Sequence, residues 1–144
     1  MRVIGIDYGR KRSGLAVTDP LQIVAGPLAT VPTASLLDYI RQYVAAEQVE
    51  AIVIGEPRRL NGEPSESARY ISPFVERLRR ELPPEIKIVE YDERFTSTLA
   101  HRAMIQGGMK KSDRRDKAQV DRIAATIILN DYLQSRQFTD DTNR

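Results

Sequence analysis

The sequence predicts an α/β fold built on one mixed five-stranded sheet with helices on both faces. Two observations predict this class. Three apolar segments of strand length follow one another with short connections, and strand-like segments then alternate with segments of helical period. Short connections make neighbouring strands antiparallel, whereas helical crossovers make later strands parallel to the first. We therefore expect three antiparallel strands followed by strands that helical crossovers connect.

The first half of the chain predicts three strands and one helix. Residues 2–7 and 14–18 are apolar, and Gly9 between them suits a hairpin because glycine adopts positive φ. A third extended segment, at about 23–30, contains Gly26 and Pro27, which are typical of an edge strand or a bulge. From Thr33, a possible N-cap, apolar residues recur with helical spacing to Val44.

The second half predicts two further strands and three helices. Residues 51–55 form a continuous apolar run, as in a strand that is buried on both faces. A helix with Pro73 inside its pattern follows, and then a strand over residues 86–90. Two last helices are expected from Thr96 to about Ile105 and from Lys117 to about Leu133. In this layout strand 2–7 is central and strand 51–55 lies beside it.

Length and composition predict one domain. We place it at residues 1–138, with a frayed tail at residues 139–144. The absence of cysteine excludes a disulfide framework and a thiolate zinc site. No apolar run approaches the roughly 18 residues of a membrane span, and the N-terminus lacks a signal-peptide pattern. We therefore expect a cytoplasmic protein that does not bind membranes.

Three carboxylates occupy positions where an acid is costly. Asp7 ends the first strand, Glu93 follows the fifth, and Asp121 begins the apolar face of the last helix. Such acids need a cation among them, and Mg²⁺ typically binds a few carboxylates together with substrate phosphates. Asp7 and Glu93 should share the carboxyl edge of the sheet, to which the last helix can bring Asp121. The pattern indicates metal-dependent phosphodiester chemistry.

Basic residues are informative by position, because a net charge of +2 does not by itself indicate nucleic-acid binding. Those at positions 77, 79 and 80 alternate with acids on a helix and predict a solvated face. Phosphate contact and solubility explain the clusters at 10–12 and 58–59 equally well. The cluster after Gly107 and Gly108 favours a loop that grips a nucleic-acid backbone. The nucleic-acid contacts that we expect are Arg10, Lys11, Arg12, Arg94, Lys110, Lys111, Arg114 and Arg115.

Four motifs, in this order, carry a family resemblance. They are Gly5-Ile6-Asp7-Tyr8-Gly9-Arg10-Lys11-Arg12-Ser13-Gly14, then Gly55-Glu56-Pro57 with Asn61-Gly62, then Asp92-Glu93-Arg94-Phe95-Thr96-Ser97, and finally Lys110-Lys111 with Asp121-Arg122-Ile123-Ala124-Ala125. From Val3 to about Leu133 the chain resembles the YqgF (RuvX) family of the ribonuclease H-like superfamily. Members of this family are described as Holliday junction resolvases and as pre-16S ribosomal RNA nucleases.

The resemblance implies a hydrolase whose acidic triad is Asp7, Glu93 and Asp121. These residues would hold two Mg²⁺ or Mn²⁺ ions, about 4 Å apart, on either side of a phosphodiester, with Asp7 as the shared ligand. The chain departs from the family pattern at Glu56, where Leu is usual; this extra acid could join the metal or face water. The only histidine, His101, is better explained as a helix residue than as a ligand.

Two other classes of protein remain as alternatives. The first strand, its Asp and the glycine-rich hairpin also resemble actin-like and sugar-kinase ATPases, but those enzymes usually need a second domain. A non-catalytic nucleic-acid-binding factor is the other alternative, although a pure binder gains nothing from three acids beside a phosphate. Structured RNA and branched DNA are both open as substrates, since either is read through shape and backbone. Monomer and homodimer are equally open.

Overall fold

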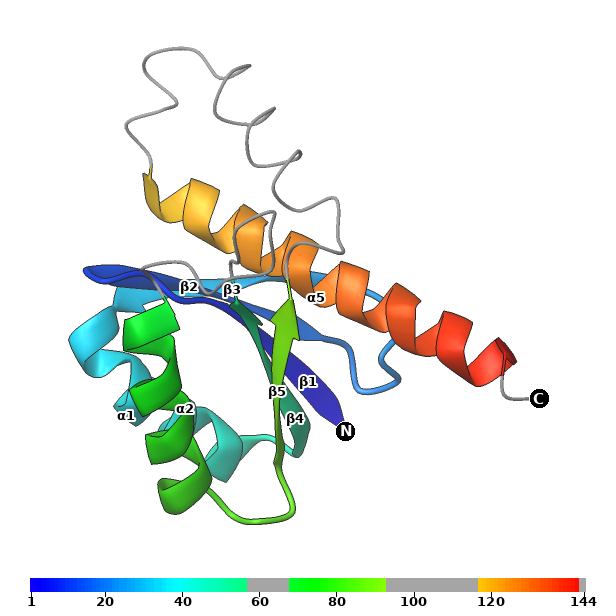
Figure 1. Cartoon of the computed structure of the whole chain (residues 1–144), viewed down its shortest axis with the longest axis horizontal. Helices are drawn as coiled ribbons and strands as arrows, with labels where there is room; N and C mark the ends of the chain where they lie inside the picture. Colours follow the sequence, from blue (N-terminus) through cyan, green and yellow to red (C-terminus); the bar gives the residue numbers. More distant parts are fainter. Residues whose placement is uncertain (57–67, 93–116, 143–144) are drawn as a thin grey trace.

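The computed structural model describes residues 1–56, 68–92 and 117–142, and it contains the predicted sheet (Figure 1). The strand order is β3-β2-β1-β4-β5. β1 pairs antiparallel with β2 and β2 with β3, whereas β1–β4 and β4–β5 are parallel. The elements are β1 (Arg2–Asp7), β2 (Arg12–Thr18), β3 (Ala25–Pro32), the 3-10 helix η1 (Thr33–Ser35), α1 (Leu36–Ala46), β4 (Val49–Glu56), α2 (Ala68–Glu81), β5 (Lys87–Asp92) and α5 (Lys117–Thr142).

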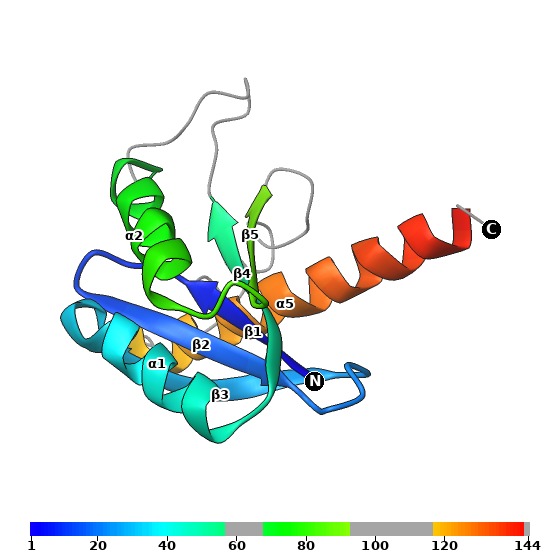
Figure 2. The ribbon, with the colours of Figure 1, turned by 90° about the horizontal axis from the view of Figure 1, so that it is seen from below.

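Helices cover both faces of the sheet, as predicted. Figures 1 and 2 show α1 and α2 together on one face and α5 crossing the other. Ile4 and Ile6 of β1 are fully buried in the core that α1 and α2 cover, while Val3 packs in the core under α5. Because side chains alternate along a strand, Asp7 belongs to the α5 side of the sheet. Tyr8, the next residue, packs against the α1–α2 core.

Two glycines allow α5 to lie directly on the central strands. A Cβ atom at Gly5 of β1 would lie 2.8 Å from the Cβ of Leu129, closer than real Cβ atoms approach. At Gly14 of β2 a Cβ would overlap the backbone carbonyl of Asp121. The absence of side chains at these two positions therefore sets the distance between the helix and the sheet.

The structure confirms one local prediction, on the third strand, and corrects two others, on Thr33 and on the end of the last helix. β3 is an edge strand, and its pairing with β2 has an irregularity between Leu15 and Ala16, so the edge-or-bulge prediction is confirmed. The Thr33 N-cap was wrong: η1 begins there without a side-chain cap, and the Thr33 hydroxyl bonds elsewhere. α5 continues to Thr142, past the end expected near Leu133. The helix expected from Thr96 lies outside the described residues, and none of the described helices could cross a membrane.

Candidate active site

The carboxyl ends of three parallel strands lie at one edge of the sheet. Ile6 of β1 pairs with Ile54 of β4, and Ile54 pairs with Glu90 of β5. β1 ends one residue after Ile6, at Asp7, and β5 ends two residues after Glu90, at Asp92, on the same edge. Glu93 follows Asp92 in the sequence and lies outside the described residues, so its predicted place in the triad stays a prediction.

Gly14 connects the two described acids of the triad. It is the cross-strand partner of Asp7, and its missing side chain leaves the space that the Asp121 backbone occupies. Opposed residues of an antiparallel pair face the same side of the sheet. The Cβ direction of Gly14 points at α5, so Asp7 faces α5 as well. The structure thus brings Asp7 and Asp121 to the same edge and the same face, as the sequence predicted.

Asp121 is held by an ion pair with Arg12. The Arg12 Nε donates to Asp121 Oδ2 at 2.5 Å, across 109 positions of sequence. The Asp121 side chain is only 19% exposed and that of Arg12 37%, so the pair is partly shielded from solvent. A charged hydrogen bond in such surroundings fixes the carboxylate more firmly than a surface pair would. Arg12 was predicted as a nucleic-acid contact, and its bond to Asp121 was not anticipated.

A network of hydroxyl groups fixes the hairpin that carries Arg12. The Thr33 hydroxyl donates to the carbonyl of Gly9 at 2.6 Å and lies 2.9 Å from the Ser13 hydroxyl, which accepts the Gly9 N–H at 3.2 Å. Ser13 is fully buried, and Thr33 also donates its backbone N–H to the carbonyl of Lys11. A Cβ at Gly9 would overlap the carbonyl of Arg12, so close packing within the hairpin explains that glycine. Hydrogen bonds of Thr33 and Ser13 therefore hold the β1–β2 turn in place.

The donor chemistry of Asp7 and Asp121 fits a hard divalent cation. Both offer only oxygen atoms, which Mg²⁺ and Mn²⁺ prefer. A carboxylate has about four lone-pair sites, so one N–H from Arg12 does not exhaust Asp121 as a ligand. Within the described parts of the chain no group of three potential ligands gathers; the third acid of the predicted set, Glu93, is outside them.

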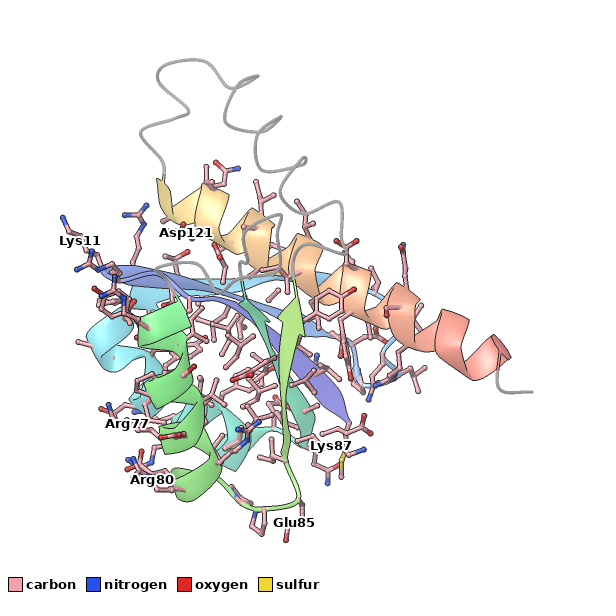
Figure 3. The ribbon with its side chains drawn as sticks, in the orientation of Figure 1. Lys11, Arg77, Arg80, Glu85, Lys87 and Asp121 are labelled. Atoms are coloured by element: carbon pink, nitrogen blue, oxygen red, sulfur yellow. The ribbon has the colours of Figure 1, made fainter. Side chains whose placement is uncertain are left out.

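Few of the predicted nucleic-acid contacts can be located. Arg10 and Lys11 are exposed in the β1–β2 turn. Figure 3 shows Lys11 at the same end of the molecule as Asp121, with Glu85 and Lys87 at the opposite end. The other predicted contacts, Arg94, Lys110, Lys111, Arg114 and Arg115, lie outside the described residues, as does the side chain of Glu56.

Solved structures of two Holliday junction resolvases have a similar fold. The solved structure of RuvC from T. thermophilus in complex with a Holliday junction substrate matches with a TM-score of 0.57 at 16% identity, over 95% of this chain and 96% of that one. A fowlpox virus resolvase, solved with its Holliday junction DNA, matches with a TM-score of 0.51 at 13% identity, over 94% and 98% of the two chains. The chain therefore has the ribonuclease H-like fold of these resolvases.

Sequence relatives identify the family. The model of the RuvX family, described as Holliday junction resolvase, matches residues 1–135, and this chain belongs to that family. A protein of Phocaeicola vulgatus named "Putative pre-16S rRNA nuclease" is 55% identical over 95% of this chain and 98% of its own length. A Porphyromonas gingivalis protein of the same name is 54% identical over 93% and 96% of the two chains. The resemblance seen in the sequence motifs is confirmed.

Proposed function

We propose that this protein is a metal-dependent nuclease that hydrolyses phosphodiester bonds in structured nucleic acid. One observation carries the proposal more than any other. Gly14 allows α5 to place Asp121 beside the end of the central strand, next to Asp7, on the same face of the sheet. Two acids at this edge have a purpose if they hold a cation at a scissile phosphate. Membership of the RuvX family supports the same chemistry.

Asp7, Glu93 and Asp121 are the residues that would hold Mg²⁺ or Mn²⁺. When bound, such ions polarise the phosphodiester, activate water for attack and stabilise the leaving oxygen. The protein's own contribution is orientation. Arg12 fixes the Asp121 carboxylate, and the network around Thr33 fixes the turn from which Arg12 extends.

Basic side chains would hold the substrate backbone against this edge. Arg10 and Lys11 both extend from the β1–β2 turn and offer N–H donors to phosphates, and Lys11 lies at the same end of the molecule as Asp121 (Figure 3). Arg94 and the basic run from Lys110 to Arg115 would add further phosphate contacts. Such contacts position a nucleic acid without reading its sequence, which suits an enzyme that recognises the shape of its substrate.

Precursor 16S ribosomal RNA is the substrate that we favour. The curated relatives above half identity carry the name of a pre-16S rRNA nuclease, and they match nearly the whole chain. Ribosomal RNA processing would place the protein in the cytoplasm. A Holliday junction is the second candidate, because the family model carries the description of a resolvase. Junction resolution takes two symmetric cuts and would require a dimer, whereas trimming an RNA end can be done by a monomer.

A direct comparison of the two substrates tests this proposal. Four-way junction DNA and a precursor-RNA hairpin are incubated with the protein at the same salt, in Mg²⁺, Mn²⁺ or Ca²⁺. We expect cleavage of the RNA in Mg²⁺ or Mn²⁺, and binding without turnover in Ca²⁺, whose looser coordination holds the attacking water less well. Cleavage of the junction alone would make the junction, rather than the RNA, the favoured substrate. Cleavage of neither would contradict the nuclease function.

A further inference from the structure

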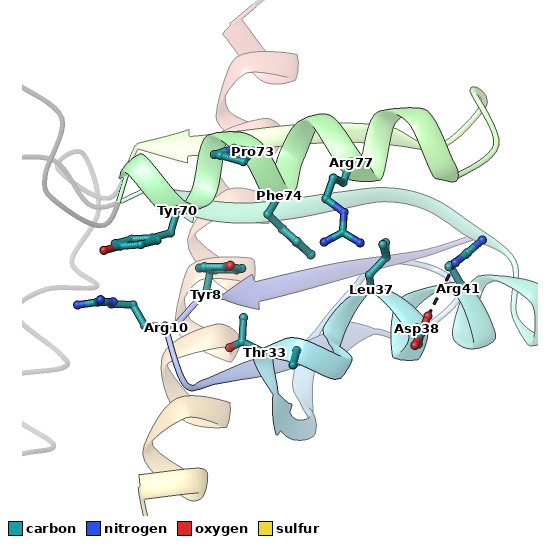
Figure 4. Close-up of a pocket in the computed structure, with 11 residues that line it drawn as sticks. Tyr8, Arg10, Thr33, Leu37, Asp38, Arg41, Tyr70, Pro73, Phe74 and Arg77 are labelled. Carbon is teal, nitrogen blue, oxygen red and sulfur yellow. Dashed lines mark ion pairs between the residues drawn. The ribbon is translucent and has the colours of Figure 1, made fainter.

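A pocket of about 420 Å³ lies between α1 and α2. These helices cover the face of the sheet opposite α5, the helix that carries Asp121 (Figure 2). Figure 4 shows the pocket below α2 and above α1, with the end of β1 between them. Its volume is within the range of small-molecule sites, about 300–1,000 Å³. Tyr8 lines it and directly follows Asp7 in the chain, so the pocket begins at the edge of the candidate active site.

Aromatic rings line the pocket at the end nearer that edge. Tyr8 packs against Phe74 with ring centroids 5.1 Å apart. The Arg10 guanidinium lies over the ring of Tyr70, 4.7 Å from its centroid, which joins the β1–β2 turn to the start of α2. Planar, uncharged surfaces of this kind bind nucleobases by stacking.

The charge of the pocket favours an anion. Arg10, Arg41 and Arg77 line it against one acid, Asp38. Asp38 is paired with Arg41 at 3.8 Å. Among the carboxylates that the structure describes, none pairs with Arg10 or Arg77. Arg77 is exposed, as the sequence pattern predicts for this helix face, and it also lines the pocket from α2 (Figure 4). Two guanidinium groups are therefore placed to bind phosphate.

We propose that this pocket binds one unpaired nucleotide of the nucleic-acid substrate, next to the scissile bond. The base would stack on Tyr70 and Tyr8, and the phosphates that flank it would bind Arg10 at one end of the pocket and Arg77 towards the other (Figure 4). Nucleotides combine a planar ring with an anionic group, and the pocket offers partners for both. The inference rests on the proposed function, because the nucleotide belongs to the substrate that is cleaved at Asp7. Asp7 and Tyr8 are adjacent residues and face opposite sides of the sheet at the end of β1. A chain that crosses this edge reaches both sites.

Binding measured without divalent metal tests the pocket separately from catalysis. The affinity for an RNA hairpin with a short unpaired tail is compared with the affinity for the blunt hairpin, in excess chelator. The proteins measured are the native protein, Tyr70→Ala, Arg77→Gln and the control Arg80→Gln. Arg80 lies on the same helix and is exposed, but it does not line the pocket. We expect the native protein to bind the tailed RNA about tenfold more tightly, the size of one base–aromatic stack. Tyr70→Ala and Arg77→Gln should lose most of this preference, and Arg80→Gln should keep it.

The outcomes separate the pocket from its alternatives. Equal affinity for both hairpins, or a preference that survives in Tyr70→Ala and Arg77→Gln, would overturn the proposal. Titration with uridine 5′-monophosphate, followed by NMR, identifies the source of the nucleotide. If this nucleotide binds saturably at Tyr70 while the unpaired tail does not change RNA affinity, the pocket binds a free nucleotide. That result would overturn its role for the substrate. A tail preference without cleavage in Mg²⁺ would support the pocket and contradict the nuclease. Tyr70 and Arg77 are exposed, and thermal unfolding checks that the variants fold.

Discussion

Gly14 and Asp121 touch through their backbones. The α-carbon of Gly14 lies so close to the carbonyl of Asp121 that no side chain fits between them, and Gly14 is the cross-strand partner of Asp7. The relationship joins residues far apart in sequence and fixes where α5 crosses the sheet. It also explains how an acid on a helix and an acid on a strand come to share one site.

The first prediction concerns this contact. Gly14→Ala forces β2 and α5 apart, and overpacking of this kind typically costs about 1–3 kcal/mol of the free energy of unfolding. Cleavage should fall as well, because Asp121 moves relative to Asp7. Gly26→Ala is the matched control, since a Cβ there meets nothing within 4 Å. Urea denaturation and cleavage rates measure both effects, and equal stability of the two variants would show that α5 does not depend on Gly14.

The second prediction concerns the ion pair of Arg12. Arg12 orients Asp121 but also sets a positive charge beside it, so Arg12→Gln should tighten the binding of Mn²⁺ by removing that repulsion, measured by electron paramagnetic resonance without nucleic acid. Stability should fall by about 1 kcal/mol, as for a partly shielded pair. Lys11→Gln removes the neighbouring charge and controls for the general field. An Mn²⁺ affinity that responds equally to both substitutions would exclude a specific role for the Arg12–Asp121 bond.

The third prediction concerns the hydroxyl of Thr33. Thr33→Val keeps the shape but leaves the Gly9 carbonyl and the buried Ser13 hydroxyl short of one partner. The free energy of unfolding should fall by about 1–3 kcal/mol, the cost of an unsatisfied buried polar group. Thr33→Ser retains the hydroxyl and should cost much less. Chemical denaturation distinguishes the two; similar losses in both would mean that methyl packing, rather than hydrogen bonding, holds the turn.

The fourth prediction concerns the basic run at positions 110–115. Replacing Lys110 and Lys111 with Ala should weaken nucleic-acid binding for all sequences and reduce the salt slope by close to one unit per lost contact. Lys87→Ala is the control, because Lys87 lies at the opposite end of the molecule from Asp121 (Figure 3). Binding isotherms over a range of salt concentrations give the slope. An unchanged slope in the double variant would assign these lysines to solubility.

The sheet was predictable because it depends on local patterns. Apolar period and connection length determine which segments are strands and which pairs are parallel, and the central place of β1 followed from them. The shared edge of Asp7 and Asp121 also followed from local patterns. The sequence shows one acid at a strand end and one on an apolar helix face, and the order of strands and helices lets both reach the same edge.

Contacts between distant residues could not be predicted in the same way. The bond of Arg12 to Asp121 spans 109 positions, and nothing in the local sequence distinguishes this arginine from its neighbours. Thr33 precedes a helix, as a cap would, but its hydroxyl bonds to the carbonyl of Gly9 instead. The pairing of β2 with β3 brings this hairpin close to Thr33. Arg77 alternates with acids like a surface residue, and only the packing of α2 against the end of β1 shows that it lines a pocket.

In the proposed function, Asp7 holds the metal with which this protein cleaves nucleic acid. Asp7→Asn preserves shape and removes the charge, and Glu85→Gln, at the far end of the molecule, is its control (Figure 3). The deciding measurement is single-turnover cleavage of the precursor-RNA hairpin in Mg²⁺, with RNA affinity measured beside it. We expect no cleavage by Asp7→Asn and native activity for Glu85→Gln. Asp7→Asn should fold normally and bind RNA equally well or more tightly, because repulsion of the phosphate is reduced. Full activity of Asp7→Asn, or of the native protein in excess chelator, would contradict this function of Asp7.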